Sequence, residues 1–137
     1  MNPDLTLKKK MKKDFKTLRI LVVDDEPLIL HVLSRFLEKK AVVTAVSTAE
    51  EALDAIDEQH YDLCFLDVKL PGMTGLDAMK IINELSPNTK VAIMTGNLLN
   101  EAMQKQVDDY AYTFIEKPFA LSDIEGVTER ATLALNQ

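Results

Sequence analysis

The sequence contains one cysteine and no long run of apolar residues. Cys64 is the single thiol among 137 residues, so no disulfide can form within the chain, and we expect a reducing cytoplasm as its compartment. No apolar run approaches the ~20 residues that a membrane-spanning helix needs. The N-terminus is too rich in lysine and too polar for a secretory signal. The sequence therefore predicts a cytoplasmic protein with no membrane span.

Charge is divided unevenly along the chain. Residues 1–17 contain six lysines and two aspartates, a net charge of +4. Because the whole chain carries −6, the remaining residues carry a net charge of −10. An acidic body is unsuited to binding duplex DNA directly, because the phosphate backbone is itself negative. We interpret residues 1–17 as a basic arm, mobile or a helical extension, that could also touch nucleic acid or anionic lipid. The domain itself is predicted to span residues 18–135.

Hydrophobic patterning switches regularly between the periods of strands and of helices. The length suits one compact domain, and 47% of the residues are apolar, enough for a real core. Short aliphatic runs predict strands at about 19–23, 41–46, 61–68, 90–95 and 111–117. Apolar residues at helical spacing predict helices at about 27–40, 48–59, 74–85, 98–107 and 121–135. Strict alternation of this kind predicts an α/β fold, a doubly wound parallel sheet with helices on both faces.

Polar residues follow four of the five predicted strands. Asp24 and Asp25 follow the first strand and Asp67 ends the third, while Thr95 and Lys117 end the fourth and fifth. In a parallel sheet, ligands bind outside the carboxyl ends of the strands. Each residue alone has an ordinary explanation: Asp25 could be the N-cap of the next helix, Thr95 another cap, and Lys117 a surface charge. Five such residues at one edge of an apolar sheet indicate a site.

Four segments carry a resemblance to a known family. "ILVVDDE", "LCFLDVKLPGMTGLD", "VAIMTG" and "FIEKPF", in that order and spacing, resemble the receiver domain of bacterial two-component response regulators over about residues 18–135. The resemblance implies a (βα)5 flavodoxin-like fold with strand order 2-1-3-4-5. It also implies that one aspartate accepts a phosphoryl group from a histidine kinase, a phosphotransfer protein or a small phosphodonor.

The resemblance also implies roles for individual residues. By position, Asp67 is the phosphoacceptor, Asp24, Asp25, Asp67 and the backbone carbonyl of Lys69 hold Mg²⁺, Lys117 binds the phosphoryl group, and Thr95 and Phe114 form a switch. The chemistry of the residues agrees, because three converging carboxylates need a cation to remain ionised together. Mg²⁺ is suitable, since it binds one or two carboxylates and completes its shell with phosphate oxygens and water.

The resemblance places the output of such a domain on one surface. The surface formed by the fourth helix, fifth strand and fifth helix would change on phosphorylation and control a partner protein or output domain. The same surface could also form a phosphorylation-dependent homodimer. Such a domain is a signalling phosphoacceptor and not an enzyme acting on other substrates. The Lys117–Pro118 peptide bond is expected to be cis.

Two other classes of protein remain as alternatives. A Mg²⁺-dependent phosphatase with an aspartate nucleophile needs the pattern Asp-x-Asp after the first strand, whereas this chain has Asp24-Asp25-Glu26-Pro27. A flavodoxin-like cofactor binder needs a phosphate-binding loop rich in Ser, Thr and Gly at the same place, where three acids would repel the flavin phosphate. Turnover of phosphomonoesters would favour the first alternative, and a yellow protein the second.

Overall fold

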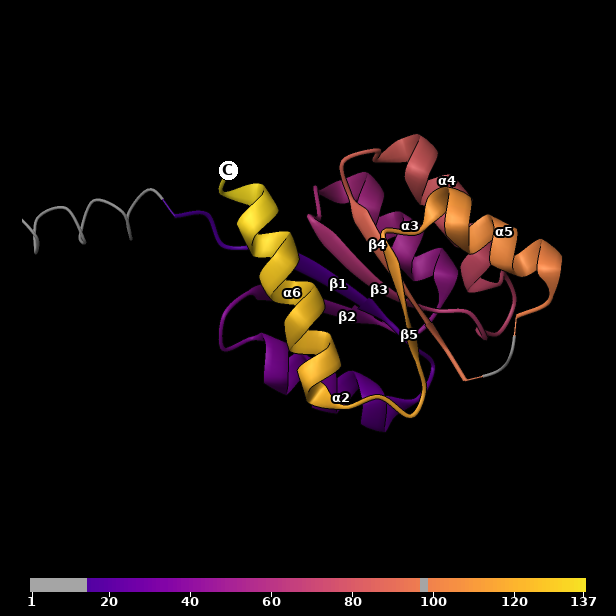
Figure 1. Cartoon of the computed structure of the whole chain (residues 1–137), viewed down its shortest axis with the longest axis horizontal. Helices are drawn as coiled ribbons and strands as arrows, with labels where there is room; N and C mark the ends of the chain where they lie inside the picture. Colours follow the sequence, from indigo (N-terminus) through magenta and orange to yellow (C-terminus); the bar gives the residue numbers. More distant parts are fainter. Residues whose placement is uncertain (1–14, 97–98) are drawn as a thin grey trace, which may run out of the picture.

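A computed structural model of the chain describes residues 15–96 and 99–137. Strands and helices alternate through this part of the chain (Figure 1). The elements are β1 (Arg19–Val23), α2 (Pro27–Leu37), β2 (Val42–Val46), α3 (Ala49–Glu58), β3 (Leu63–Asp67), α4 (Gly75–Leu85), β4 (Lys90–Thr95), α5 (Glu101–Tyr110), β5 (Thr113–Glu116) and α6 (Leu121–Leu135). The predicted order of elements is therefore confirmed.

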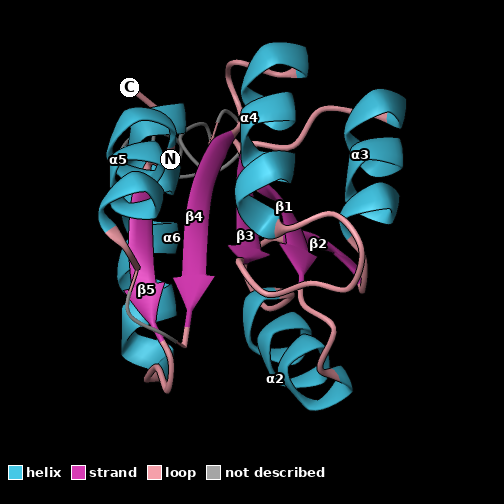
Figure 2. Ribbon diagram, turned by 90° about the vertical axis from the view of Figure 1, so that its right-hand side faces the viewer, coloured by secondary structure: helices cyan, strands magenta, loops and turns pink. Residues whose placement is uncertain are grey.

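The five strands form one parallel sheet in the order β2-β1-β3-β4-β5, as predicted (Figure 2). Strand order reverses after β2, because the chain continues from one edge of the sheet to β3 on the other side of β1. The central strand β3 has all five residues buried, as a strand covered on both faces requires. This topology confirms the flavodoxin-like doubly wound fold.

Each face of the sheet is covered by its own set of helices. Side chains that alternate along β1 show the division, since Ile20 and Val22 pack with α2 and α6, while Leu21 and Val23 pack with α3, α4 and α5. Burying one such aliphatic side chain contributes about 1.5–3 kcal/mol to folding. Cys64 lies in the second of these cores with no exposed surface, as expected for a small buried hydrophobe, and burial raises the pKa of its thiol to about 12.

Several helix boundaries differ from the predicted ones. α5 spans Glu101–Tyr110 rather than 98–107, because the Asn100 side chain caps it by accepting the N–H of Met103 at 2.8 Å. α2 ends at Leu37, three residues before the predicted end at residue 40. At the start of α3, the Thr48 side chain caps the helix by accepting the N–H of Glu51 at 3.1 Å. Asparagine caps are easily missed in a sequence when no clear apolar run follows them.

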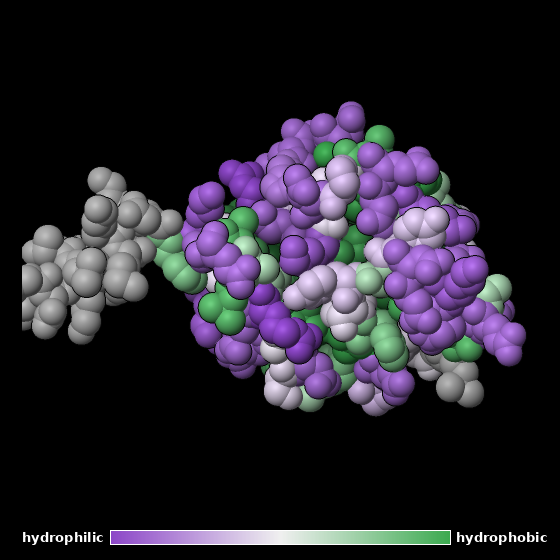
Figure 3. Space-filling model, turned by 45° about the horizontal axis from the view of Figure 1, so that its top comes forward, coloured by the Kyte–Doolittle hydropathy of each residue, from purple (hydrophilic) through white to green (hydrophobic). Residues whose placement is uncertain are grey.

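Some predictions concern residues that the structure does not describe. Residues 1–14 of the proposed basic arm and the residues 97–98 before α5 lie outside the described part of the chain. Among the described helices, none is long and apolar enough to cross a membrane. The face seen in Figure 3 is mainly hydrophilic, with small apolar areas between polar ones.

Candidate functional site

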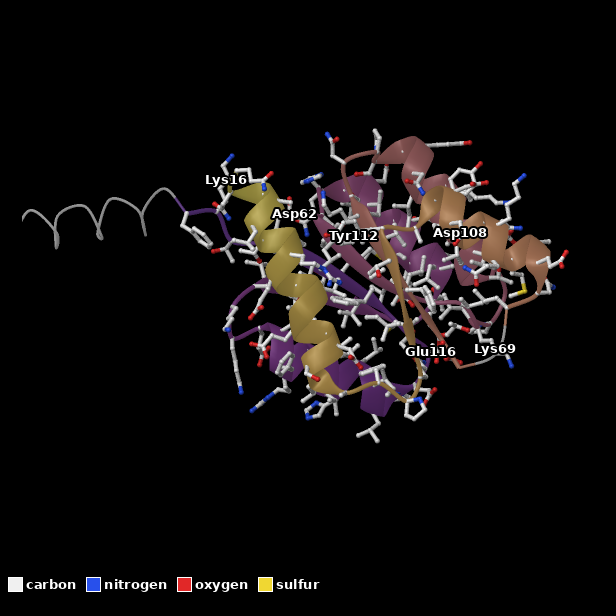
Figure 4. The ribbon with its side chains drawn as sticks, in the orientation of Figure 1. Lys16, Asp62, Lys69, Asp108, Tyr112 and Glu116 are labelled. Carbon is white, nitrogen blue, oxygen red and sulfur yellow. The ribbon has the colours of Figure 1, made fainter. Side chains whose placement is uncertain are left out.

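The polar residues that follow the strands come together at one end of the sheet. Figure 4 shows Lys69 and Glu116 at this end, and Lys16 and Asp62 at the opposite end. All strands are parallel, so their carboxyl ends share this edge. The site lies where strand order reverses, as the fold predicts.

Three carboxylates form the acidic part of the site. Val23 of β1 pairs with Leu66 of β3, so the residues that follow them, Asp24 and Asp67, lie side by side. Carboxylate oxygens of Asp24, Asp25 and Asp67 all lie within 4.8 Å of one another. Asp24 is 0% and Asp67 4% exposed, whereas Asp25 is open to solvent. The predicted acid cluster is therefore present, with two buried members and one exposed member.

Lys117 reaches the same cluster from the end of β5. Its Nζ donates to Asp24 Oδ2 at 2.7 Å and to Asp67 Oδ2 at 3.2 Å. Glu26 lies 3.7 Å from the same ammonium. The Lys117 backbone N–H donates to the Thr95 carbonyl at 2.7 Å, which fixes the start of the side chain beside β4. The peptide bond between Lys117 and Pro118 is cis, as predicted.

Burial and charge act together on the acid and on the ammonium. Burial, and next the neighbouring charge of Asp24, raise the pKa of Asp67, although Lys117 and the backbone N–H of Lys69 partly offset this rise. For Lys117, burial alone would lower the pKa, but the hydrogen bonds and charges of Asp24 and Asp67 together outweigh it and raise the pKa. The ammonium therefore stays protonated and compensates part of the negative charge.

Backbone contacts hold the acids in place. The Glu26 N–H donates to Asp24 Oδ1 at 2.9 Å, and the Lys69 N–H donates to Asp67 Oδ1 at 3.2 Å. Glu26, and not Asp25, occupies the N-cap position of α2, and it forms no side-chain cap. Capping therefore does not explain why three acids stand here, which favours the interpretation of Asp25 as a metal ligand.

The first turn of α4 packs directly on the backbone of the central acid. The Gly75 N–H donates to the Val68 carbonyl at 2.9 Å. A Cβ added to Gly75 would lie 1.9 Å from the carbonyl oxygen of Asp67. A side chain there would displace either the helix or the strand end, so Gly75 sets the position of Asp67. We did not predict this role, although glycine just after a turn cluster and a Thr N-cap is the available signal.

Thr95 and Phe114 line one cavity beside the site. Its volume is about 260 Å³, and its other lining residues are Gly96, Leu99, Gln104, Glu116 and Lys117. Thr95 is buried, whereas Phe114 is 42% exposed. Phe114 is therefore not a core residue, the role a phenylalanine in a strand would have by default. The structure brings the two predicted switch residues together around a space next to Lys117.

The residues present fit a divalent cation. Oxygen donors from Asp24, Asp25 and Asp67 converge, two of these residues are buried, and the Lys117 ammonium pairs with Asp24 and Asp67. Mg²⁺ prefers carboxylate and carbonyl oxygens and usually keeps several waters, which the exposed side of Asp25 would admit. The role of the Lys69 carbonyl as a further ligand stays a prediction.

Two contacts of the site escaped sequence reasoning. We expected Lys117 to meet a phosphoryl oxygen, and its hydrogen bonds to Asp24 and Asp67 were not predicted. Glu26 was recognised as a third acid in the sequence, but its proximity to Lys117 was not. Both follow from electrostatics, since an ammonium near uncompensated carboxylates moves to them.

The chain is similar to known signalling proteins. Residues 20–129 match the family model described as the response regulator receiver domain. The chain is 30% identical over 113 residues to sporulation initiation phosphotransferase F of Bacillus subtilis, covering 82% of this chain and 91% of that protein. It is 38% identical over 113 residues to the two-component response regulator PhoP of Pseudomonas aeruginosa, covering 79% of this chain and 48% of that protein. The chain thus spans about half the length of this second relative.

A solved structure has the same arrangement of elements. The CheY-like receiver domain protein from Methanospirillum hungatei JF-1 superposes with a TM-score of 0.79 at 29% identity, covering 85% of this chain and 94% of that one.

Proposed function

The chain belongs to the response regulator receiver domain family, and from this premise we propose that it accepts a phosphoryl group on Asp67. The observation that carries the proposal is the convergence of Asp24, Asp67 and Lys117, from three different strand ends, within hydrogen-bond distance. The donor would be a histidine kinase, a phosphotransfer protein or a small phosphodonor. Such a protein promotes only its own phosphorylation and dephosphorylation.

Asp67 acts as the nucleophile in this proposal. One of its carboxylate oxygens attacks phosphorus, and the bond from phosphorus to the donor nitrogen or oxygen breaks, with its electron pair staying on the donor. Phosphoryl transfer of this kind passes through a loose transition state, so the protein contributes position and charge neutralisation. Asp67 is suitable because it lies at the open end of the sheet with its backbone fixed by α4.

Lys117 and the metal ligands neutralise the incoming charge. Asp24, Asp25 and Asp67 would hold Mg²⁺, which when bound compensates the carboxylates and coordinates a phosphoryl oxygen. The Lys117 ammonium already lies 3.2 Å from Asp67, so it can bind a second phosphoryl oxygen after a small movement. The Thr95 hydroxyl, at the end of the neighbouring strand β4, would donate to a third.

The same contacts can change a partner surface. If Thr95 moves towards a phosphoryl group on Asp67, the cavity it shares with Phe114 changes shape, and the exposed ring can move into it. The surface formed by α5, β5 and α6 exposes large apolar side chains, which are enriched where proteins bind one another: Tyr110, Tyr112, Phe114 and Leu121. We assign the contact with an output protein or domain, or with a second copy, to this surface.

Mass spectrometry of the protein after treatment with acetyl phosphate and Mg²⁺ tests the proposal. We expect one added phosphoryl group that hydroxylamine removes, and none in Asp67→Asn. The matched control is Asp108→Asn, the same change at an exposed carboxylate on α5, which should be labelled like the wild type. Full labelling of Asp67→Asn would contradict the assignment.

Two further measurements, NMR and a phosphatase assay, test the switch and the alternative function. NMR signals of β5 around Phe114 should shift on phosphorylation of the wild type and remain unchanged in Thr95→Ala. Sustained release of p-nitrophenol from p-nitrophenyl phosphate would instead support the phosphatase alternative, because a phosphoacceptor of this family modifies itself and does not turn over such a substrate repeatedly.

A further inference from the structure

A groove of about 720 Å³ lies between α6 and the end of α2, away from the phosphorylation site. We call it the α2–α6 groove. It is lined by Phe15, Thr17, Phe36, Leu37, Lys39, Lys40, Glu125, Thr128, Glu129, Thr132 and Leu133. Its apolar members include two side chains that are largely exposed, Phe15 at 52% and Leu133 at 64%. Exposed apolar surface around a hollow of this size marks an interaction site.

The N-terminal segment is fastened to α6 at this groove. The Asn136 side chain accepts the Lys16 N–H at 2.7 Å and donates to the Lys16 carbonyl at 3.0 Å. The same amide donates to the Thr132 carbonyl of α6 at 2.9 Å, which orients it. Figure 4 shows Lys16 beside the C-terminal end of α6. Phe15, the next residue towards the N-terminus, lines the groove, so the preceding residues join the domain at its rim.

The sequence of residues 1–14 is complementary to the groove. Leu7, Met11 and Phe15 recur every four residues, the spacing that places side chains on one face of a helix. Five lysines lie between residues 8 and 13. The α6 wall of the groove carries Glu125 and Glu129, while the α2 side carries Lys39 and Lys40, and Lys40 lies 3.5 Å from Glu125. Glu129 is therefore the acid with which the lysines of the arm would pair. Residues 7–15 in helical conformation and the α6 wall from Glu125 to Leu133 both extend ~12 Å, at 1.5 Å per residue.

We propose that residues 7–14 pack into the α2–α6 groove of their own chain. Leu7 and Met11 extend the apolar contact that Phe15 begins, against Phe36 and Leu133, and the lysines meet the acidic side of α6. The tether through Lys16 makes the association intramolecular, and a short tether gives effective concentrations of about millimolar, so weak contacts suffice. The basic arm thereby covers one face of the domain, and any partner that binds α2 and α6 there competes with it.

NMR of the full chain with ¹³C-labelled methionine methyl groups tests the proposal. Six methionines give a simple spectrum, and the signal absent in Met11→Leu identifies Met11. We expect NOEs from the Met11 methyl group to the Phe36 ring and to Leu133. Leu133→Ser should reduce the NOE to Phe36 at least severalfold. The matched control is Leu28→Ser, the same change at a leucine 69% exposed on α2 that does not line the groove, which should leave the NOE intact.

Each other outcome overturns the proposal. A Met11 methyl group at its unfolded chemical shift with no NOE to the groove shows that the arm does not bind there. NOEs found only between differently labelled chains in a mixed sample show that a second copy is the occupant. An NOE to Phe36 that is equally strong in Leu133→Ser and Leu28→Ser shows that the α6 wall of the groove does not hold Met11. None of these readings depends on phosphorylation of Asp67.

Discussion

Two opposing influences act on the carboxyl group of Asp67. Burial and the adjacent Asp24 raise its pKa. Lys117 and the Lys69 N–H favour the ionised form, but they offset only part of this rise. A pKa above the ordinary value of 3.8 means that ionisation is less favourable in the folded than in the unfolded chain. The ionised form of Asp67 is thus present in the metal-free protein at some cost to stability.

The metal-free protein should therefore become more stable when Asp67 is replaced by asparagine. The wild-type free energy of unfolding should fall as pH rises from 3.8 through the raised pKa of Asp67, because the unfolded chain releases that proton first. Asp67→Asn lacks this fall and should exceed the wild type by roughly 1 kcal/mol at neutral pH, the scale of one like-charge contact at ~4 Å. Urea unfolding in EDTA at acidic and neutral pH measures the pH dependence of the wild type and the difference in stability between the wild type and Asp67→Asn.

Asp108→Asn controls for the loss of one surface charge, since Asp108 lies exposed on α5. It should change stability little and show the wild-type dependence on pH. Equal stability of Asp67→Asn and wild type at neutral pH would mean that Asp67 is not destabilised by its surroundings.

Residues of the site could be predicted from the sequence where they lie at the end of a strand, because the strand end fixes their position. Asp24, Asp67, Thr95 and Lys117 were found because a parallel sheet places the carboxyl ends of its strands at one edge. The bonds that Lys117 makes could not be found in this way, because they depend on how a long side chain crosses β4 to reach the acids.

Strands were easier to predict than helix ends. The aliphatic runs of β1 and β4 match the predicted ranges, because burial on both faces leaves an unbroken apolar signal. The start of α5 was predicted three residues early, because a polar helix (mostly charged and amide side chains) gives a weak apolar signal and its cap is one asparagine. The close approach of α4 to β3 had no signal in the periodicity, since it depends on a missing side chain at Gly75.

The contact between α4 and β3 can be tested with two glycines in helices. Gly75→Ala places a methyl group 1.9 Å from the Asp67 carbonyl oxygen, so it should lower the free energy of unfolding by at least about 1–3 kcal/mol, the usual cost of overpacking. It should also slow phosphorylation by acetyl phosphate, because the backbone of the acceptor must shift. Chemical unfolding and the rate of labelling measure the two effects.

Gly126→Ala is the matched change in α6, where an added Cβ meets nothing within 4 Å. It should stabilise the protein by about 0.5–1 kcal/mol, since alanine loses less conformational entropy than glycine in a helix. If both variants had the same stability, the approach of α4 to Asp67 would be looser than the structure shows.

At the scale of the whole molecule, the site joins three strand ends that are distant in sequence. Lys117 and Asp24 lie 93 residues apart along the chain, and Lys117 and Asp67 lie 50 apart. The acids meet only in the folded state, so the unfolded chain offers no comparable cluster for a cation. The proposed binding of Mg²⁺ would therefore be linked to folding of the entire domain.

This linkage predicts that Mg²⁺ raises the melting temperature and the free energy of unfolding. At a concentration 100 times its dissociation constant, a ligand that binds only the folded state stabilises it by about 2.7 kcal/mol. Asp25→Asn should lose most of this gain at the same Mg²⁺ concentration, because it removes one of three converging carboxylates. Asp25 is exposed, so its replacement should change the metal-free stability little. Thermal unfolding with Mg²⁺, and with NaCl of equal ionic strength to account for screening, measures the difference. An equal gain in Asp25→Asn and wild type would place the cation elsewhere on the acidic surface.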